Sequence, residues 1–148
     1  MAYVPMFEDL KDQLVIVVGG GKIAFRKVQK LMPYEPKVMV IAPEIIPELE
    51  DMPGISCMKR KVQEEDLEKN PAMVIAATDK QELNLAIASA CRERKIPVNV
   101  VDDLENCSFV FPALVKQGAF SAGICTSGTS PTAAAYNKEK LKNILPEH

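Results

Sequence analysis

The sequence contains a single histidine, His148, which is its last residue. Catalytic machinery and metal sites that depend on several histidines are therefore excluded by count. No two of the four cysteines form a Cys-x-x-Cys pair, so we expect reduced thiols in a cytoplasmic protein rather than a metal cage or a disulfide framework. The cysteines are Cys57, Cys91, Cys107 and Cys125.

The chain also lacks long apolar runs and an excess of basic residues. No apolar run approaches the roughly 20 residues that span a bilayer, and the N-terminus lacks the basic and apolar regions of a secretory signal. The 18 Lys and Arg residues against 20 Asp and Glu residues give a net charge of -2, and the basic run 59–61 is typical of a solvated loop. We therefore expect no membrane and no nucleic acid as a partner.

Short apolar segments alternate with amphipathic ones as far as residue 103. This alternation predicts a doubly wound parallel sheet covered by helices on both faces. Ile23, Val28 and Leu31 are expected on the buried face of the first helix, and Asp79 is expected to cap the third. The pattern predicts strands at 14–18, 37–42, 55–58, 72–77 and 97–101, and helices at about 22–32, 64–69 and 80–94.

The pattern changes after residue 103. Residues 109–115 and 120–125 are predicted to be two extended segments joined at 116–118, and the helix that begins at Pro131 is not followed by a strand. The sequence therefore predicts an α/β protein in which a doubly wound sheet, residues 1–103, precedes a small α+β region, residues 104–148.

Residues 15–24, VIVVGGGKIA, join the first predicted strand to the first predicted helix. Gly19-x-Gly21-x-x-Ala24 is the dinucleotide fingerprint with alanine in the third place. The first glycine permits a sharp turn, the second lets a pyrophosphate approach the backbone, and the small third residue lets helix and strand pack closely. Free N–H groups at the start of the helix favour phosphate. This context favours a dinucleotide site over a purely structural corner.

The acidic residue that usually binds the ribose hydroxyls is missing from the end of the second predicted strand. Ala42 stands at that place, and Glu44 lies two residues later, within reach of the ribose. No arginine follows directly to clamp a 2′-phosphate, so NAD is favoured over NADP.

The fourth and fifth predicted strands end in polar residues. In an open parallel sheet, ligands lie beyond the carboxyl ends of the strands, so Thr78 and Asp102 are expected to face the glycine turn. Thr78 is placed to border the cofactor, and Asp102 is placed to act as a general base at the end of a rigid strand. The alternative that Asp102 and Asp103 are only polar loop or capping residues stays open.

Residues 126–131, TSGTSP, precede the last predicted helix. Ser130 suits the N-cap and Pro131 the first helical position. An exposed helix N-terminus with the hydroxyls of Thr126, Ser127 and Ser130 would also suit an anionic, carboxylate-rich ligand. Both interpretations are compatible with the spacing.

Together these motifs resemble the precorrin-2 dehydrogenase family, found as the N-terminal part of siroheme synthases. GxGxxA alone would not single out this family, whereas VNVVD followed by SFVFPA and SGTSP does. The matching segments follow the family's order: PMFEDLKDQLVIVVGGGKIAFRK (5–27), VIAATDKQELN (74–84), VNVVDD (98–103), CSFVFPALV (107–115) and TSGTSP (126–131).

The resemblance implies a Rossmann domain followed by a dimerisation and substrate-facing region in a homodimer. It implies NAD-dependent oxidation of precorrin-2 to sirohydrochlorin on the route to siroheme, and some members also insert iron into the product. The family's essential aspartate aligns with Asp102, and its cofactor contacts align with the glycine turn, Lys22-Ile23 and Pro43-Glu44. Many members carry a second glycine where Ser127 stands, and a longer helical tail.

The implied reaction removes a hydride and a proton, and a carboxylate is a suitable proton acceptor. The same carboxylate would suit the pyrrole N–H protons that leave during metal insertion, although the residues predict no metal site. Two alternatives remain. One is a regulatory dinucleotide-binding module without catalysis, which would typically carry an acid where Ala42 stands. The other is a structural partner that keeps the fold without the activity.

Overall fold

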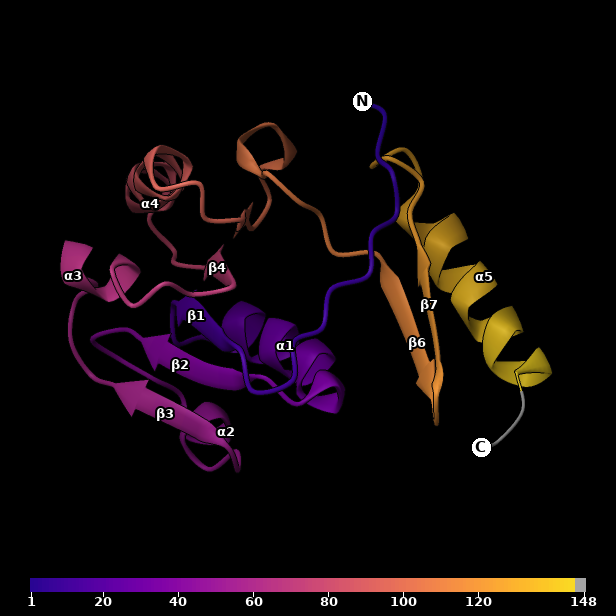
Figure 1. Cartoon of the computed structure of the whole chain (residues 1–148), viewed down its shortest axis with the longest axis horizontal. Coiled ribbons are helices and arrows are strands. Elements are labelled where there is room, and N and C mark those ends of the chain that lie inside the picture. Colours follow the sequence, from indigo (N-terminus) through magenta and orange to yellow (C-terminus); the bar gives the residue numbers. More distant parts are fainter. Residues whose placement is uncertain (146–148) are drawn as a thin grey trace. The chain divides into compact units, whose positions relative to one another are not determined.

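The computed structural model describes residues 1–145, which belong to two compact units (Figure 1). The larger unit is Asp9–Phe109, and the smaller comprises residues 1–8 and the chain from Val110 onward. This division falls later than the expected boundary after residue 103. The cause is local, because Ser108 returns to the fifth strand, where its N–H donates to Val98 O and its Oγ accepts from Val98 N–H, both at 2.8 Å. The roles expected for the two regions stay predictions.

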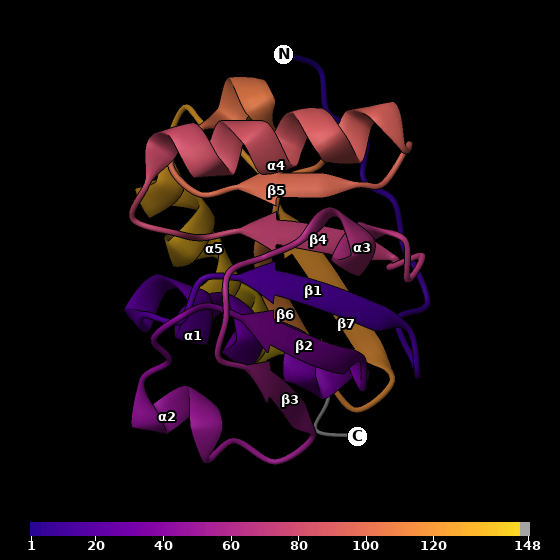
Figure 2. The ribbon, with the colours of Figure 1, turned by 90° about the vertical axis from the view of Figure 1, so that its left-hand side faces the viewer.

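The larger unit is built on a five-stranded sheet in which every pair of neighbouring strands is parallel, as expected. The order β3-β2-β1-β4-β5 places β1 at the centre, and the chain crosses to the other side of β1 when it enters β4 (Figure 2). Ligands of open α/β sheets bind at such a switch point, beyond the carboxyl ends of the strands. The strands are β1 Leu14–Val18, β2 Lys37–Ile41, β3 Ile55–Met58, β4 Met73–Ala76 and β5 Val98–Val100.

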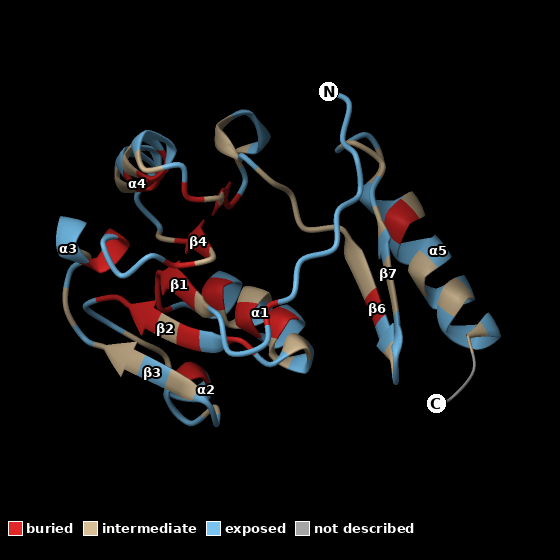
Figure 3. Cartoon of the chain, in the orientation of Figure 1, coloured by how far each residue is buried: buried red, intermediate tan, exposed pale blue. Residues whose placement is uncertain are grey.

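Helices cover both faces of this sheet. Alternate strand residues such as Ile16 and Val74 pack in one core with Leu67 of α3 and Ile87 of α4. The intervening residues, such as Val17, are also buried, and the alternation of side chains along a strand places them on the opposite face of the sheet. Helix α1 contributes its own buried residues Ala24, Val28 and Leu31 (Figure 3). The helices of this unit are α1 Lys22–Leu31, α2 Pro47–Glu50, α3 Glu64–Leu67 and α4 Gln81–Glu93, with single 3-10 turns η1 Met32–Tyr34 and η2 Leu104–Asn106.

Two sequence-based expectations about the helices are wrong. Ile23 is 45% exposed rather than buried with Val28, because it belongs to the first turn of α1, beyond the end of β1. Asp79 does not cap α4, since the N-cap position is Lys80 and carries no side-chain cap. The start of α4 is fixed instead by Asn84, whose Oδ1 accepts from Thr78 N–H at 3.1 Å. Helix α2 and both 3-10 turns were not predicted by the periodicity.

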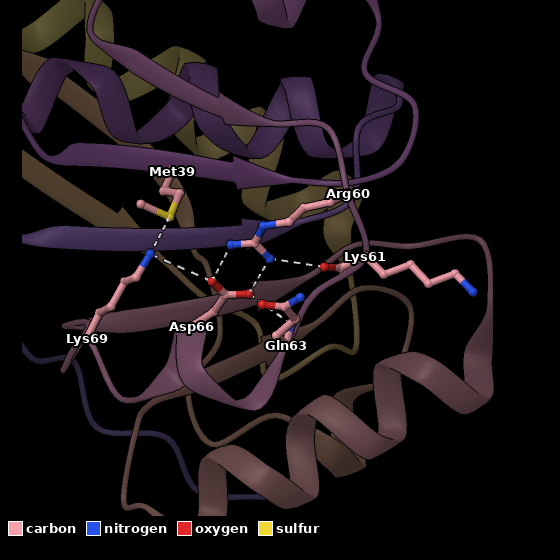
Figure 4. A network of polar contacts seen from close by, with 6 residues as sticks. All are labelled: Met39, Arg60, Lys61, Gln63, Asp66 and Lys69. Carbon is pink, nitrogen blue, oxygen red and sulfur yellow. Dashed lines mark hydrogen bonds and ion pairs between the residues drawn. The ribbon is translucent and has the colours of Figure 1, made fainter.

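A buried carboxylate, Asp66, fixes the connection from β3 to β4 (Figure 4). Its two oxygens accept from the Arg60 guanidinium at 2.8 and 2.7 Å, and Oδ2 also accepts from Gln63 N–H at 2.8 Å. Lys69 Nζ lies 3.7 Å from Oδ1. The bond to Gln63 completes a capping box at the start of α3, so a helix of four residues is fixed by one side chain that is only 2% exposed.

The smaller unit is an antiparallel hairpin with one helix. Strands β6 (Ala113–Gln117) and β7 (Phe120–Ile124) pair in register from Ala113 with Ile124 to Gln117 with Phe120, and α5 (Pro131–Ile144) follows. The second extended segment and the helix are as expected, whereas the first strand begins at Ala113 and runs on to Gln117, later than the expected 109–115, because Lys116 and Gln117 still pair with Ser121 and Phe120. Of the described residues of this unit, only Val115 and Ala134 are buried.

Candidate nucleotide-binding and catalytic site

The glycine turn follows β1 at the centre of the sheet. Gly19 has a φ of +132°, a conformation that side chains disfavour, and a Cβ there would overlap the carbonyl oxygen of Ala77. A Cβ at Gly20 would overlap the carbonyl oxygen of Glu44. Two glycines are therefore required by close packing against the ends of the neighbouring strands, and Gly20 is one that the fingerprint did not single out.

Gly21 has a different environment. It is the N-cap of α1, and a Cβ built on it would meet no atom within 4 Å. No side chain caps the helix, so the N–H groups of its first turn, at Lys22 and Ile23, are left without a capping side chain beside the open Gly21. This is the geometry that a pyrophosphate needs in order to approach the backbone at a helix N-terminus.

The loop after β2 packs directly on this turn. Ile46 N–H donates to Gly20 O at 2.9 Å, and Gly19 N–H donates to Ile41 O at 3.0 Å. Pro43 and Glu44 are exposed beside the turn, whereas Ala42 is buried. The structure thus brings together the glycine turn and the Pro43-Glu44 pair, and it leaves Glu44 as the acidic side chain of this loop nearest to the turn.

Thr78 follows β4 beside Gly19, and its polar groups are engaged by residues at the start of α4. Its hydroxyl lies 2.6 Å from Asn84 Oδ1 and 3.1 Å from Lys80 O, and Asn84 Nδ2 donates to Thr78 O at 3.1 Å. Asn84 is only 2% exposed. The interlocked pair fixes the strand end against which the glycine turn packs, and a contact between Thr78 and a cofactor stays a prediction.

The two carboxylates at the end of β5 have different environments. Asp103 Oδ1 accepts from Asn106 N–H at 3.3 Å, so this residue caps η2, as one of the sequence-based alternatives proposed. Asp102 is exposed, has a left-handed backbone with a φ of +58°, and makes no hydrogen bond or salt bridge with any of residues 1–145. Of the two, Asp102 is therefore the carboxylate available to a ligand.

A half-buried lysine of α1, Lys27, lies within electrostatic range of Asp102. Burial, followed by repulsion from Lys30, lowers the pKa of the Lys27 ammonium group, while attraction to Asp102 partly opposes this effect. The surroundings of Asp102 therefore include a cation supplied by the helix that starts at the glycine turn.

The TSGTSP segment belongs to the smaller unit, at the start of α5. Thr126 Oγ accepts from Ser130 N–H at 3.0 Å, and Ser130 Oγ accepts from Ala133 N–H at 3.2 Å. Ser130 is thus the N-cap of α5 and Pro131 its first residue, as predicted. Ser127 has a φ of +54°. A role of Thr126, Ser127 and Ser130 toward a substrate stays a prediction.

Neither a metal centre nor a membrane span is found in the part of the chain that the structure describes. Within residues 1–145, no three or more His, Cys, Asp or Glu side chains are grouped so that they could hold a metal ion. No helix among these residues is long and apolar enough to cross a bilayer.

Comparison with known proteins decides the family. The family model described as "Putative NAD(P)-binding" matches residues 6–113. The siroheme synthase of Sodalis glossinidius (strain morsitans) is 38% identical over 149 residues, which are 99% of this chain and 31% of that protein. The solved structure of SirC, precorrin-2 dehydrogenase, is 30% identical with a TM-score of 0.69, over 99% of this chain and 72% of that one. The chain belongs to the precorrin-2 dehydrogenase family.

The precorrin-2 dehydrogenase family membership and the Rossmann-like fold that the motifs predicted are both confirmed. Siroheme synthase 2 of Yersinia pestis (strain Pestoides F) is a further relative, 39% identical over 99% of this chain. The chain spans about a third, 31%, of the length of these curated relatives.

Sequence reasoning missed two side chains that fix the site in this precorrin-2 dehydrogenase family member, Asn84 and Cys107. Asn84 left a signal, because it follows the buried spacing of Ile87, Ala88 and Cys91 on α4 while being polar. The sequence around Cys107 gave no such signal. Its contact with β5 is made from a loop, and a loop carries no hydrophobic periodicity.

Proposed function

We propose that this protein catalyses the NAD-dependent dehydrogenation of precorrin-2 to sirohydrochlorin in siroheme synthesis. The observation that carries the proposal is the pairing of an open Gly21 at an uncapped helix N-terminus with an exposed Asp102 at the same edge of the sheet. The SirC relationship supports the substrate, because that relative is a precorrin-2 dehydrogenase.

The residues of the chain fit NAD. The N–H groups at the start of α1, from Lys22 and Ile23, would bind the pyrophosphate, and the side of Gly21 without a Cβ would leave it room. Glu44 would accept hydrogen bonds from the ribose hydroxyls and would repel the 2′-phosphate of NADP. When bound, NAD supplies the acceptor for the hydride that leaves the macrocycle.

Asp102 would act on the substrate as the proton acceptor. Dehydrogenation of precorrin-2 releases one hydride and one proton, and an exposed carboxylate on a well-fixed turn is suited to take the proton. Lys27 lies close enough to attract this carboxylate, and its charge would also favour an acidic substrate over a neutral one.

The first test is turnover of precorrin-2 with NAD, which is measured through the absorbance of the NADH that forms. Asp102→Asn is expected to lower kcat by about 100-fold or more, the scale of a lost general base, while the Kd for NAD stays unchanged. Asp79→Asn is the matched control, because Asp79 is exposed near the same edge of the sheet. NADP in place of NAD is expected to give a lower kcat/KM.

Full activity of Asp102→Asn would remove this residue from its role. Binding of NAD by the wild-type protein without turnover of precorrin-2 would instead favour the regulatory module or the structural partner. Ferrous or cobaltous ion added after the dehydrogenation tests whether the same protein also inserts a metal into its product.

We also propose that the protein is a cytoplasmic homodimer. An isolated two-stranded hairpin has little stability of its own, and the described part of the smaller unit buries only two residues. Phe120 and Tyr136 of this unit are 44% and 61% exposed, and a second copy would cover such side chains. The free thiols of all four cysteines agree with a reducing compartment.

A further inference from the structure

The turn that presents Asp102 is spanned by the sulfur of Cys107. Val100 N–H donates to Cys107 Sγ at 3.1 Å, on the strand side of Asp102. The same Sγ lies 3.3 Å from Val100 O and 3.2 Å from Asp103 O, and its S–H can donate to either of these carbonyls. One side chain thus ties together the residues that bracket Asp102 in the chain.

The carboxylate of Asp103 ties the same turn to α4 and η2. Its Oδ2 accepts from Asn106 Nδ2 at 2.8 Å and from Gln81 Nε2 at 3.0 Å, and its Oδ1 accepts from Asn106 N–H. Arg92 of α4 donates to Asn106 O at 2.7 Å. The loop after β5 is therefore held by the Cys107 thiol and also by Gln81 and Arg92 of α4.

Asp102 itself contributes nothing to this arrangement. Its backbone is left-handed, which a residue with a Cβ disfavours unless its surroundings impose it. Its carboxylate forms no hydrogen bond or salt bridge within the described residues 1–145. The conformation of Asp102 must therefore be imposed by its neighbours, and those are the bonds of Cys107 and Asp103.

We propose that Cys107 and Asp103 are positioning residues that hold the Asp102 carboxylate in place for proton transfer. The proposal rests on the proposed role of Asp102 in dehydrogenation. A thiol suits this place because it accepts from one backbone group and donates to another while it stays neutral. Burial raises the pKa of the Cys107 thiol, which keeps the S–H intact at neutral pH.

The test compares Cys107→Ala and Cys107→Ser with the matched control Cys57→Ala. Cys57 is a half-buried thiol of β3, at the opposite edge of the sheet. Cys107→Ala is expected to lower kcat for precorrin-2 by about 10- to 100-fold, the cost of a small misplacement of a reacting group. The Kd for NAD is expected to stay within about twofold, because the glycine turn is untouched. Serine retains a donor and an acceptor and is expected to recover part of kcat.

Amide hydrogen exchange provides a second measurement that does not depend on activity. Cys107→Ala is expected to lose protection at the Val100 and Asn106 amides while the Val17 amide, at the centre of the sheet, keeps its protection. If Cys107→Ala does not fold, Asp103→Ala and Asp103→Asn replace it, because asparagine keeps an acceptor for Asn106 N–H and alanine does not.

Wild-type kcat together with unchanged protection at Val100 in Cys107→Ala would overturn the proposal. A parallel loss of protection at Val17 would also overturn it, since the thiol would then support the whole sheet rather than one turn. If the wild-type protein fails to oxidise precorrin-2, the proposed function fails separately. Amide exchange then still decides whether Cys107 holds the turn.

Discussion

Neighbouring residues of the same type in this chain differ in environment because of backbone geometry. Asp102 and Asp103 are adjacent carboxylates, yet one accepts three hydrogen bonds and the other is exposed on a left-handed turn. Gly19, Gly20 and Gly21 form a similar series, in which two glycines are required by packing and one borders open space. Substitutions at neighbouring positions should therefore have very different effects.

Ser127 is a residue at which a substitution should stabilise the protein. Its φ of +54° places a Cβ in the left-handed region, so Ser127→Gly is expected to raise the free energy of unfolding by up to about 1 kcal/mol. The matched control is Ser121→Gly in β7, where the loss of a side chain from an extended strand should lower the same quantity. Urea titration of the three proteins measures both changes, and equal effects at the two positions would contradict the prediction.

Two helices of the larger unit, α3 and α4, are held at their N-terminal ends by side-chain hydrogen bonds. Helix α3 has four residues and begins with the Asp66 capping box, and α4 begins with the Thr78-Asn84 pair. Both devices lie at the start of a helix that follows a strand, so they fix the connections from β3 to β4 and from β4 to β5. Isolated helices of such length are unstable in water, which makes these contacts decisive.

Asp66 should make the stability of the protein dependent on pH. The hydrogen bonds from Arg60, aided by that from Gln63, lower the pKa of the Asp66 carboxyl from 3.8 to about 2. Because the folded pKa lies below the unfolded value, the stabilisation is complete at neutral pH and is lost as the pH falls through the range between the two. Asp66→Asn is expected to cost about 2 kcal/mol at neutral pH and progressively less below about pH 4.

Urea unfolding at pH values on both sides of this range measures the effect. Glu65→Gln is the matched control, because it removes an exposed carboxylate from the same turn of α3 and is expected to change the free energy of unfolding by less than about 0.5 kcal/mol. A difference between Asp66→Asn and wild type that stays constant down to acidic pH would show that the charge of Asp66 is not what stabilises the connection.

At the scale of the whole molecule, the two units differ in the size of their hydrophobic cores. The larger one buries most residues of β1, β2, β4 and β5, whereas the described part of the smaller one buries only Val115 and Ala134. A hairpin and a helix of this kind gain stability by covering their apolar side chains with another surface. The proposed homodimer supplies that surface with a second copy of the same unit.

Sedimentation equilibrium tests this association. The wild-type protein is expected at about twice the 16.3 kDa of one chain, and the double substitution Phe120→Ser with Tyr136→Ser should weaken the dimer by about tenfold or more, as expected when aromatic contacts are removed from an interface. Leu85→Ser, on α4 of the larger unit and 38% exposed, is the control. A wild-type protein that sediments at the mass of one chain would refute the homodimer.

The sequence by itself determined the elements and their class. Short apolar runs such as Leu14–Val18 and Met73–Ala76 predict buried strands, and their alternation with helices predicts a parallel sheet. The glycine spacing predicted the turn after β1, because backbone sterics act within a few residues. The ordered motifs also predicted the family, which the comparisons confirmed.

Only the tertiary structure decided which polar residues are engaged and which are available. Three features depend on contacts between separate segments or on loop geometry. They are the exposure of Ile23, the bond of Asn84 rather than Asp79 at the start of α4, and the contacts of Cys107 around Asp102. Such contacts leave no periodic pattern, because they are set by the way strand ends and helix ends meet in space.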